Sequence, residues 1–283
     1  MAPEGQMLPA IALPGATLAA VDTRSPNLAL QAMRRCMEGL AFGRCVLLTD
    51  LQTFERPSGR DAAGIEVLDI GAEVRSASDY SMFILNRLAD YIDTEHVLLV
   101  QWDGFVINPQ LWSDHWLAFD YIGAPWKARP DRSGKVYAVG NGGFSLRSKR
   151  LLRALAAPSF ATRLHHPEDL CIGLTLRDEL EARHGIRFAD PHTARVFALE
   201  NEPVDCPTFG FHGLFNLGLA YPDQELMLFI DALPASVVGG RDAFKLARTL
   251  LRSKRPVPCR HLLQRRRSIG HLDLRSRLML LRC

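Results

Sequence analysis

One carboxylate stands where an apolar run ends. Residues 97–109 read VLLVQWDGFVINP, so Asp103 directly follows a segment with the character of a buried strand. A carboxylate at the carboxyl end of a central strand faces the crevice where open α/β sheets bind ligands, and it can hold a hard cation. Asp-Gly is also a strong signal for a β-hairpin turn. This stretch leaves both interpretations of Asp103 open.

Two further carboxylates, Glu168 and Asp169, stand side by side in HPEDL. A proline near a helix start, followed by acidic residues in the first turn, is typical of a helix N-terminus. A carboxylate in that position can also take a proton from a substrate hydroxyl as a general base. The pair is therefore a candidate for acid–base chemistry, and complementing the helix dipole is the alternative.

A glycine-rich loop separates two strand-like segments in VYAVGNGGFSLRS, residues 136–148. Asn141, Gly142 and Gly143 would let backbone N–H groups approach a ligand that larger side chains would block. Asn-Gly is also the preferred pair of a type I′ hairpin turn, and both roles can hold together. Trp126, in GAPW, can stack on a sugar ring or belong to the core.

These residues are expected on an α/β frame. Apolar runs such as 97–100 suit parallel strands that are covered on both faces. The predicted order is β-α-β-β-α-β, with strands at 15–21, 44–50, 64–70 and 96–102 and helices at 25–40 and 78–93. Further strands are expected on either side of the glycine loop, and further helices at 149–156 and 166–185.

Five stretches follow one another along the chain: QWDGFVINP, DYIGAPW, VGNGGFSLRS, HPEDL and FGFHG. In this order and spacing they resemble a bacterial and fungal domain family of unknown function, which is itself similar to GT-A-fold glycosyltransferases. The resemblance covers about residues 16–216. It implies a GT-A-like fold, with a mixed, mostly parallel sheet flanked by helices. It also implies transfer of a sugar from a nucleoside diphosphate donor to a hydroxyl of a glycan or lipid-linked acceptor, with inversion favoured.

The resemblance gives Asp103 the position of the last Asp in the Asp-x-Asp motif of GT-A enzymes. There it would hold Mn²⁺ or Mg²⁺ on the donor diphosphate, with His212 of FGFHG closing the site. Gln101 replaces the first Asp of the motif. One carboxylate is a poor site for a hard cation unless phosphate, water and His212 complete it. A hydrogen-bonded core histidine is the alternative for His212.

The resemblance also places the other candidates around the two substrates. Asp169, or Glu168 in its place, would act as general base on the acceptor hydroxyl, and the neighbouring carboxylate would orient the acceptor. Residues expected to bind substrate are Trp126, at the acceptor, and Asn141, Gly142 and Gly143. Residues expected at the nucleotide, beyond the first strands, are Asp22, Thr23, Arg24, Asp50, Gln101, Trp102 and Asp103. Capping or turn roles are the alternative for Asp22 and Asp50.

The composition is that of an ordinary globular protein. The chain has 283 residues, of which 47% are hydrophobic and 23% charged. Its six cysteines form no CxxC pair, which favours reduced thiols over a disulfide framework or structural zinc. Residues 1–21 lack a basic leader and are broken by three prolines, so neither a signal peptide nor a membrane span is expected. We expect a cytoplasmic protein.

Charge divides the chain unevenly. Residues 241–283 hold 13 Lys or Arg against two Asp or Glu, which leaves 21 against 29 in the rest. We expect a lead-in at 1–14, a catalytic domain at 15–235 and a basic amphipathic helical extension at 236–283. The extension could lie on the anionic inner surface of a membrane. It could also dock on the acidic catalytic domain. Nucleic acid is a weaker partner, because Phe244 is the only aromatic residue at 241–283.

Two other functions stay open beside sugar transfer. A non-catalytic nucleotide- or glycan-binding module would keep the fold without the chemistry, and Gln101 favours it. A metal-dependent nucleotidyltransferase or phosphotransferase would also use a carboxylate at a strand end. It would release pyrophosphate or phosphate and no nucleoside diphosphate.

Overall fold

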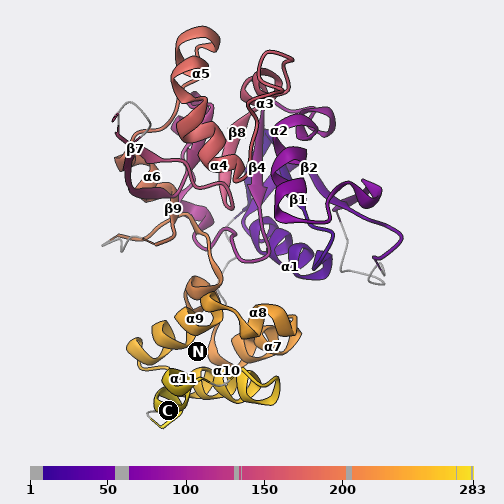
Figure 1. Cartoon of the computed structure of the whole chain (residues 1–283). Helices are drawn as coiled ribbons and strands as arrows, with labels where there is room; N and C mark the ends of the chain where they lie inside the picture. Colours follow the sequence, from indigo (N-terminus) through magenta and orange to yellow (C-terminus); the bar gives the residue numbers. More distant parts are fainter. Residues whose placement is uncertain are drawn as a thin grey trace. The chain divides into compact units, whose positions relative to one another are not determined.

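The chain forms two compact units, which we call unit 1 (Met1–His212) and unit 2 (Gly213–Cys283) (Figure 1). The computed structural model describes residues 9–54, 64–130, 134, 136–201, 206–271, 273–281 and 283. The composition break near 235–241 lies within unit 2, and the domain limits at 14 and 235 stay predictions. Residues 1–8 of the expected lead-in lie outside the described residues, whereas 11–14 already belong to the first strand.

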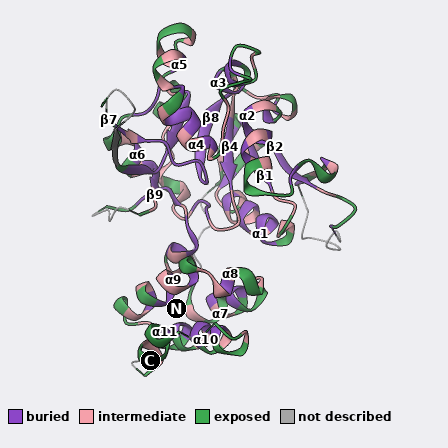
Figure 2. Ribbon diagram, viewed as in Figure 1, coloured by how far each residue is buried: buried purple, intermediate pink, exposed green. Residues whose placement is uncertain are grey.

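A six-stranded sheet forms the centre of unit 1, in the order β3-β2-β1-β4-β8-β5. Its strands are β1 (Ile11–Val21), β2 (Leu40–Thr49), β3 (Glu66–Asp69), β4 (His96–Val100), β5 (Tyr121–Gly123) and β8 (Ser145–Ser148). Strands β3, β2, β1 and β4 are parallel to one another, and β8 is antiparallel to both of its neighbours. The sheet is therefore mixed and mostly parallel, as predicted, and Figure 2 shows central strands such as β4 and β8 mostly buried.

Helices flank this sheet because its central strands, such as β4, bury side chains on both faces. Val97 and Leu99 of β4 lie in one core cluster with Phe83 and Ile84, while Leu98 between them is equally buried. The helices of the first half are α1 (Pro26–Met37) and α2 (Ala77–Asn86), with the 3₁₀ turns η2 (Gly71–Glu73) and η3 (Leu88–Tyr91). The helix predicted at 78–93 is thus divided into α2 and η3.

The second half of unit 1 contains shorter elements. Strands β6 (Pro125–Pro130) and β7 (Val136–Val139) form one small antiparallel sheet, and β9 (Ala198–Leu199) and β10 (Gly210–Phe211) form a parallel one. The helical elements are η4 (Pro109–Leu111), η5 (Asp114–Ala118), α3 (Lys149–Leu155), α4 (Glu168–Leu170), the π-helical turn η6 (Cys171–Thr175), α5 (Arg177–His184) and α6 (Pro191–Phe197). The single helix predicted at 166–185 is thus broken at η6, where a Cβ on Gly173 would lie 3.0 Å from the Trp126 ring.

Unit 2 is built from helices. They are η7 (Leu214–Leu219), α7 (Asp223–Ala232), α8 (Ala235–Gly239), α9 (Arg241–Arg252), α10 (Pro256–Ser268) and α11 (Leu274–Leu280). Helix α9 buries its apolar stripe, Ala243, Leu246, Ala247 and Leu250. That stripe therefore belongs to the core of unit 2. It does not form the exposed apolar face that would contact a membrane. In the described part of the chain, no helix is both long and apolar enough to cross a bilayer.

Candidate functional site

A two-residue turn ends the apolar run at Asp103. Gln101 and Gly104 exchange both backbone hydrogen bonds, at 3.2 and 3.0 Å, so Trp102 and Asp103 form the turn. The chain does bend here, but the turn is not centred on Asp-Gly, and Gly104 is not among the described glycines with positive φ. A Cβ on Gly104 would lie 3.0 Å from both the Phe211 carbonyl and the His212 ring. Glycine is needed for this close approach, which brings Asp103 next to His212.

His212 joins three of the sequence blocks. Its Nε2 lies 3.2 Å from Gln101 Oε1 and 3.7 Å from Asp103 Oδ1. Its Nδ1 lies 3.2 Å from Glu200 Oε1 and 3.3 Å from Asn141 Nδ2. A Cβ on Gly143 would lie 2.1 Å from Nε2, so the glycine loop leaves space for the imidazole. Asp103, the glycine loop and FGFHG therefore meet at one ring.

The surroundings of His212 favour its protonated form. Burial opposes protonation, but the charges of Asp103 and Glu200 and the Glu200 hydrogen bond outweigh it and raise the pKa of His212 to about 9. A protonated imidazole donates from both nitrogens and offers no lone pair to a metal. Among the described residues, no group of three or more His, Cys, Asp or Glu could hold a metal ion. These side chains do not form a metal site by themselves, and the cation requirement stays a prediction.

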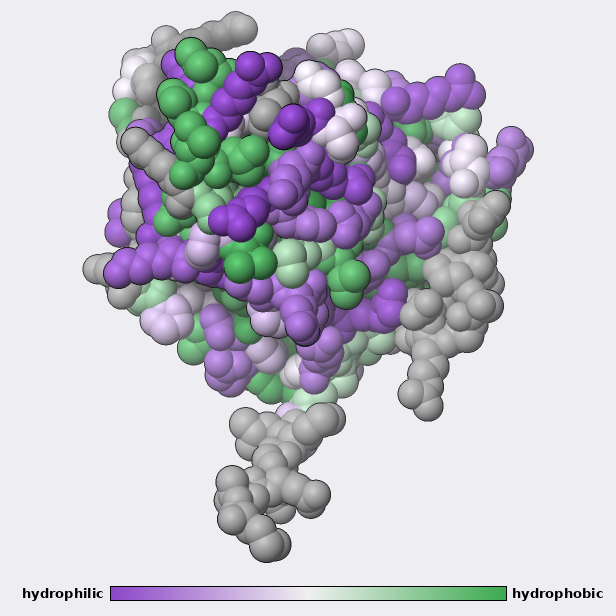
Figure 3. All heavy atoms as spheres, turned by 90° about the horizontal axis from the view of Figure 1, so that it is seen from below, coloured by the Kyte–Doolittle hydropathy of each residue, from purple (hydrophilic) through white to green (hydrophobic). Residues whose placement is uncertain are grey.

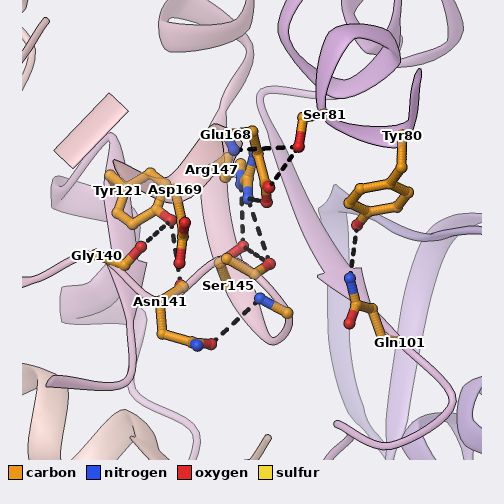
Figure 4. A network of polar contacts seen from close by, with 12 residues as sticks. Tyr80, Ser81, Gln101, Tyr121, Gly140, Asn141, Ser145, Arg147, Glu168 and Asp169 are labelled. Carbon is orange, nitrogen blue, oxygen red and sulfur yellow. Dashed lines mark hydrogen bonds and ion pairs between the residues drawn. The ribbon is translucent and has the colours of Figure 1, made fainter. Parts of the chain in front are cut away.

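Glu168 belongs to a buried ion pair (Figure 4). Its Oε1 accepts from Arg147 Nη2 at 3.2 Å, and its Oε2 accepts from Ser81 Oγ at 3.4 Å. Arg147 is fully buried and also donates to the Gly142 carbonyl and to Ser145 Oγ. A Cβ on Gly142 would lie 2.3 Å from Glu168 Oε1. Both oxygens of Glu168 are therefore used inside the protein, and Gly142 leaves space for them.

Asp169, the next residue, lines a hollow of about 570 Å³. Burial, and after it the negative charges of Glu168 and Glu200, raise its pKa to about 6. A carboxylate with a pKa near neutrality can accept a proton from a bound hydroxyl. The full lining consists of Pro125, Trp126, Lys127, Asn141, Pro167, Asp169, Leu170, Glu200 and Asn201.

Trp126 and Asn141 belong to the same hollow, so three predicted site residues share it. Trp126 is only 9% exposed and packs against Gly140 and Gly173. It therefore belongs to the core and also forms part of the wall of the hollow. The hairpin interpretation of the glycine loop was wrong, because β7 pairs with β6 whereas β8 pairs with β4 and β5. Gly142 and Gly143 are not among the residues that line the hollow.

Of the residues expected at the nucleotide, four lie beyond β1 and β2, and the other three follow β4. Asp22 Oδ1 accepts the backbone N–H groups of Arg24 and Ser25, and Asp50 Oδ1 accepts that of Gln52. Thr23 donates to the Val74 carbonyl, and the Arg24 side chain is exposed. The turn role considered for both aspartates is thus present in the structure.

Asp22 also shares an edge of the sheet with Asp103. Ala20 of β1 pairs with Val100 of β4, so the two strands end side by side. The pKa of Asp22 is raised, first by burial and also by the charge of Asp103. Two carboxylates therefore face the same region beyond the strand ends, next to the turn at Trp102 and Asp103.

Sequence reasoning missed Arg147, Ser81, Lys127 and Glu200. Arg147 had a usable signal, because a cation inside the buried alternation of FSLRS requires a partner. Glu200 follows β9 directly, as Asp103 follows the strand that the sequence predicted at 96–102. Ser81 lies in α2 and Lys127 lies in β6. The sequence pattern around each residue gives no indication that its polar side chain belongs to a site.

Comparison with known proteins adds one finding. No curated protein matches the chain. Residues 64–212, more than half of the chain, match a family described as a protein of unknown function (DUF5672). The matched region contains Asp103, Glu168, Asp169 and His212. The chain therefore belongs to the DUF5672 family.

Proposed function

We propose that the protein is a glycosyltransferase, which moves a sugar from a nucleoside diphosphate donor to a hydroxyl of a glycan or lipid-linked acceptor. One observation carries this proposal: Asp169, Trp126 and Asn141 line a single hollow of unit 1. Its volume, about 570 Å³, lies within the range of small-molecule sites. A tryptophan beside carboxylates and amides is a suitable surface for a sugar, which needs an apolar face to stack on and acceptors for its hydroxyls.

Asp169 is the general base of this proposal. The acceptor O–H bond breaks, its proton passes to Asp169, and the acceptor oxygen attacks the anomeric carbon as the bond to the diphosphate breaks. The nucleoside diphosphate leaves with the electron pair. A pKa of about 6 leaves Asp169 ionised at neutral pH and basic enough to help. Glu168 is already held by Arg147 and Ser81, which favours Asp169 over its neighbour.

The donor is proposed at the edge formed by Asp22 and Asp103. A turn beyond a central strand of a mostly parallel sheet is the usual place for a ligand in open α/β folds. This placement, and the sheet order, support the GT-A-like fold that the sequence resemblance implies. Lys127, the one cation among the described residues that line the hollow, would meet negative charge on the leaving group.

The test measures nucleoside diphosphate release from a panel of nucleotide sugars, with the full chain and with Asp169→Asn. We expect the variant to lose activity by a factor on the order of 10² to 10⁴, the usual contribution of a general base. Asp90→Asn is the matched control, because Asp90 is an exposed aspartate in the first turn of η3 and is not among the residues that line the hollow. Equal turnover in Asp169→Asn and wild type would refute the role of Asp169.

A non-catalytic module is the second candidate, and one observation favours it. Gln101, in the place of the first Asp of the motif, donates to Tyr80 Oη at 3.0 Å and lies 3.2 Å from His212 Nε2. It is thus occupied by protein contacts. Calorimetry with the same nucleotide sugars, with and without Mn²⁺, separates the two. Metal-independent sugar binding without turnover supports the module, and release of pyrophosphate would point to nucleotidyl transfer.

A further inference from the structure

Helix α11 of unit 2 turns an apolar face outward. Leu274, Leu278 and Leu281 are 73%, 56% and 84% exposed. Their spacing of four and three residues places them on one side of the helix. Ser276, on the opposite side, is fully buried. A surface helix normally directs its apolar stripe to the core, so this exposed stripe requires another explanation.

Arginines stand on both sides of this stripe. One hollow, of about 500 Å³, is lined by Arg267, Gly270, Arg277, Leu280 and Leu281. A second, of about 390 Å³, is lined by Phe244, Arg248, Leu251, Arg252, Arg275, Leu278 and Met279. No acidic residue lines either hollow among the described residues. We call the two hollows together with Leu274 the α11 surface.

We propose that the α11 surface docks on a bilayer that contains anionic phospholipids. Guanidinium groups bind phosphate oxygens through paired hydrogen bonds, which suits lipid headgroups. Exposed leucines beside these cations can enter the boundary between headgroups and acyl chains. Figure 3 looks onto unit 2 from below the view of Figure 1 and shows a group of hydrophobic residues beside hydrophilic ones.

Other occupants fit less well. Among the described residues that line the two hollows, Phe244 is the single aromatic one, so bases of a nucleic acid would find few rings to stack on. A second copy could cover the leucines, but a symmetric contact would bring the arginines of one copy toward those of the other. The inference is independent of the proposed function, because it concerns unit 2 alone.

The experiment is sedimentation of the full chain with vesicles of phosphatidylcholine alone or mixed with phosphatidylglycerol. We expect binding to the mixed vesicles and none to the neutral ones. Arg275→Glu should weaken binding by about tenfold, since one cation near the surface accounts for about fivefold and its reversal for more. Leu278→Ser with Leu281→Ser should also weaken it by about tenfold or more, and this loss should persist at high salt.

Matched variants provide the controls. Leu228→Ser changes a leucine of α7 that is 71% exposed, and Arg153→Glu reverses an exposed arginine of unit 1. Neither residue belongs to the α11 surface, and both variants should bind like wild type. Equal binding to neutral and anionic vesicles would overturn the proposal. So would sedimentation equilibrium that shows a dimer lost in the Leu278→Ser and Leu281→Ser variant while vesicle binding is unchanged.

Discussion

Arg147 of unit 1 and the arginines of the α11 surface in unit 2 use their charge in opposite ways. In unit 1, Arg147 is fully buried and its charge is matched by Glu168, which is 6% exposed. In unit 2, Arg248, Arg252 and Arg275 line an open hollow with no acidic residue in its lining, within the described residues. The sequence agrees, because unit 2 holds 13 Lys or Arg against five Asp or Glu, and unit 1 holds 21 against 26.

This difference shows that charged side chains have two roles in the protein. A buried, matched pair fixes positions, since each group has a large desolvation penalty that only its partner offsets. Arg147 in this way fixes Glu168 beside the hollow that Asp169 lines. An exposed excess of one sign fixes nothing locally, but its field reaches an oppositely charged surface over about a Debye length. Variants of both kinds can test this contrast.

The largest effect is expected at Arg147. Arg147→Met removes the cation and leaves the Glu168 carboxylate buried without its partner. Breaking a buried pair in this way usually destabilises a protein by about 3–5 kcal/mol. We expect the free energy of unfolding, measured with urea, to fall by that amount.

A second variant distinguishes a lost ion pair from lost packing. Adding Glu168→Gln to Arg147→Met removes the orphaned charge, so part of the stability should return. Buried Arg147 Nη1 has no hydrogen-bond partner among the described residues, which makes an apolar replacement of similar length less costly. A loss below about 1 kcal/mol for Arg147→Met alone would contradict the matched-pair view of unit 1.

An intermediate effect on the free energy of unfolding is expected for Asp169→Asn, and its sign follows from the pKa of Asp169. Its pKa is raised from 3.8 to about 6, so the folded state binds a proton more tightly than the unfolded state. This contribution to stability is present below about pH 4 and is lost as the pH rises through about 6. At pH 7, Asp169→Asn should therefore raise the free energy of unfolding by about 1–3 kcal/mol, and below pH 4 it should change little.

Asp190 is the opposite-sign control for that measurement. The hydrogen bonds from Thr193 lower its pKa, so its carboxylate stabilises the folded state at neutral pH and loses this effect in acid. Asp190→Asn should reduce stability at pH 7. Equal pH profiles of the two variants would show that the local environment of Asp169 is not the one described above.

The sequence predicts the frame of unit 1 better than its site. Apolar runs such as 97–100 mark strands that are buried on both faces, and Ser25 with Pro26 marks the start of α1, because these signals are local. The partners of β8 are not local, because β8 pairs with β4 and β5 and leaves β7 to pair with β6, so the hairpin that the Asn141-Gly142 pair suggested does not form. Glu200 could not be placed at the hollow for the same reason.

Helical periodicity alone also does not predict whether the apolar face of a helix is buried or exposed. The stripe of α9 and the stripe of α11 both have helical spacing in the sequence, yet the first is core and the second is exposed. The period identifies the apolar face of a helix but not what that face contacts. Only the packing of unit 2 separates a stripe that stabilises the fold from one that is available to a partner.

The smallest effect is expected for an exposed pair of unit 2. Asp242 lies 2.8 Å from Lys245 one turn along α9, with side chains 55% and 33% exposed. Asp242→Asn should lower the free energy of unfolding by no more than about 1 kcal/mol, since exposed pairs and first-turn acids each contribute little. High salt should abolish the difference from wild type, because it screens both terms. A salt-independent loss comparable to that of Arg147→Met would mean that charges in unit 2 fix positions as they do in unit 1, and the contrast between the units would fail.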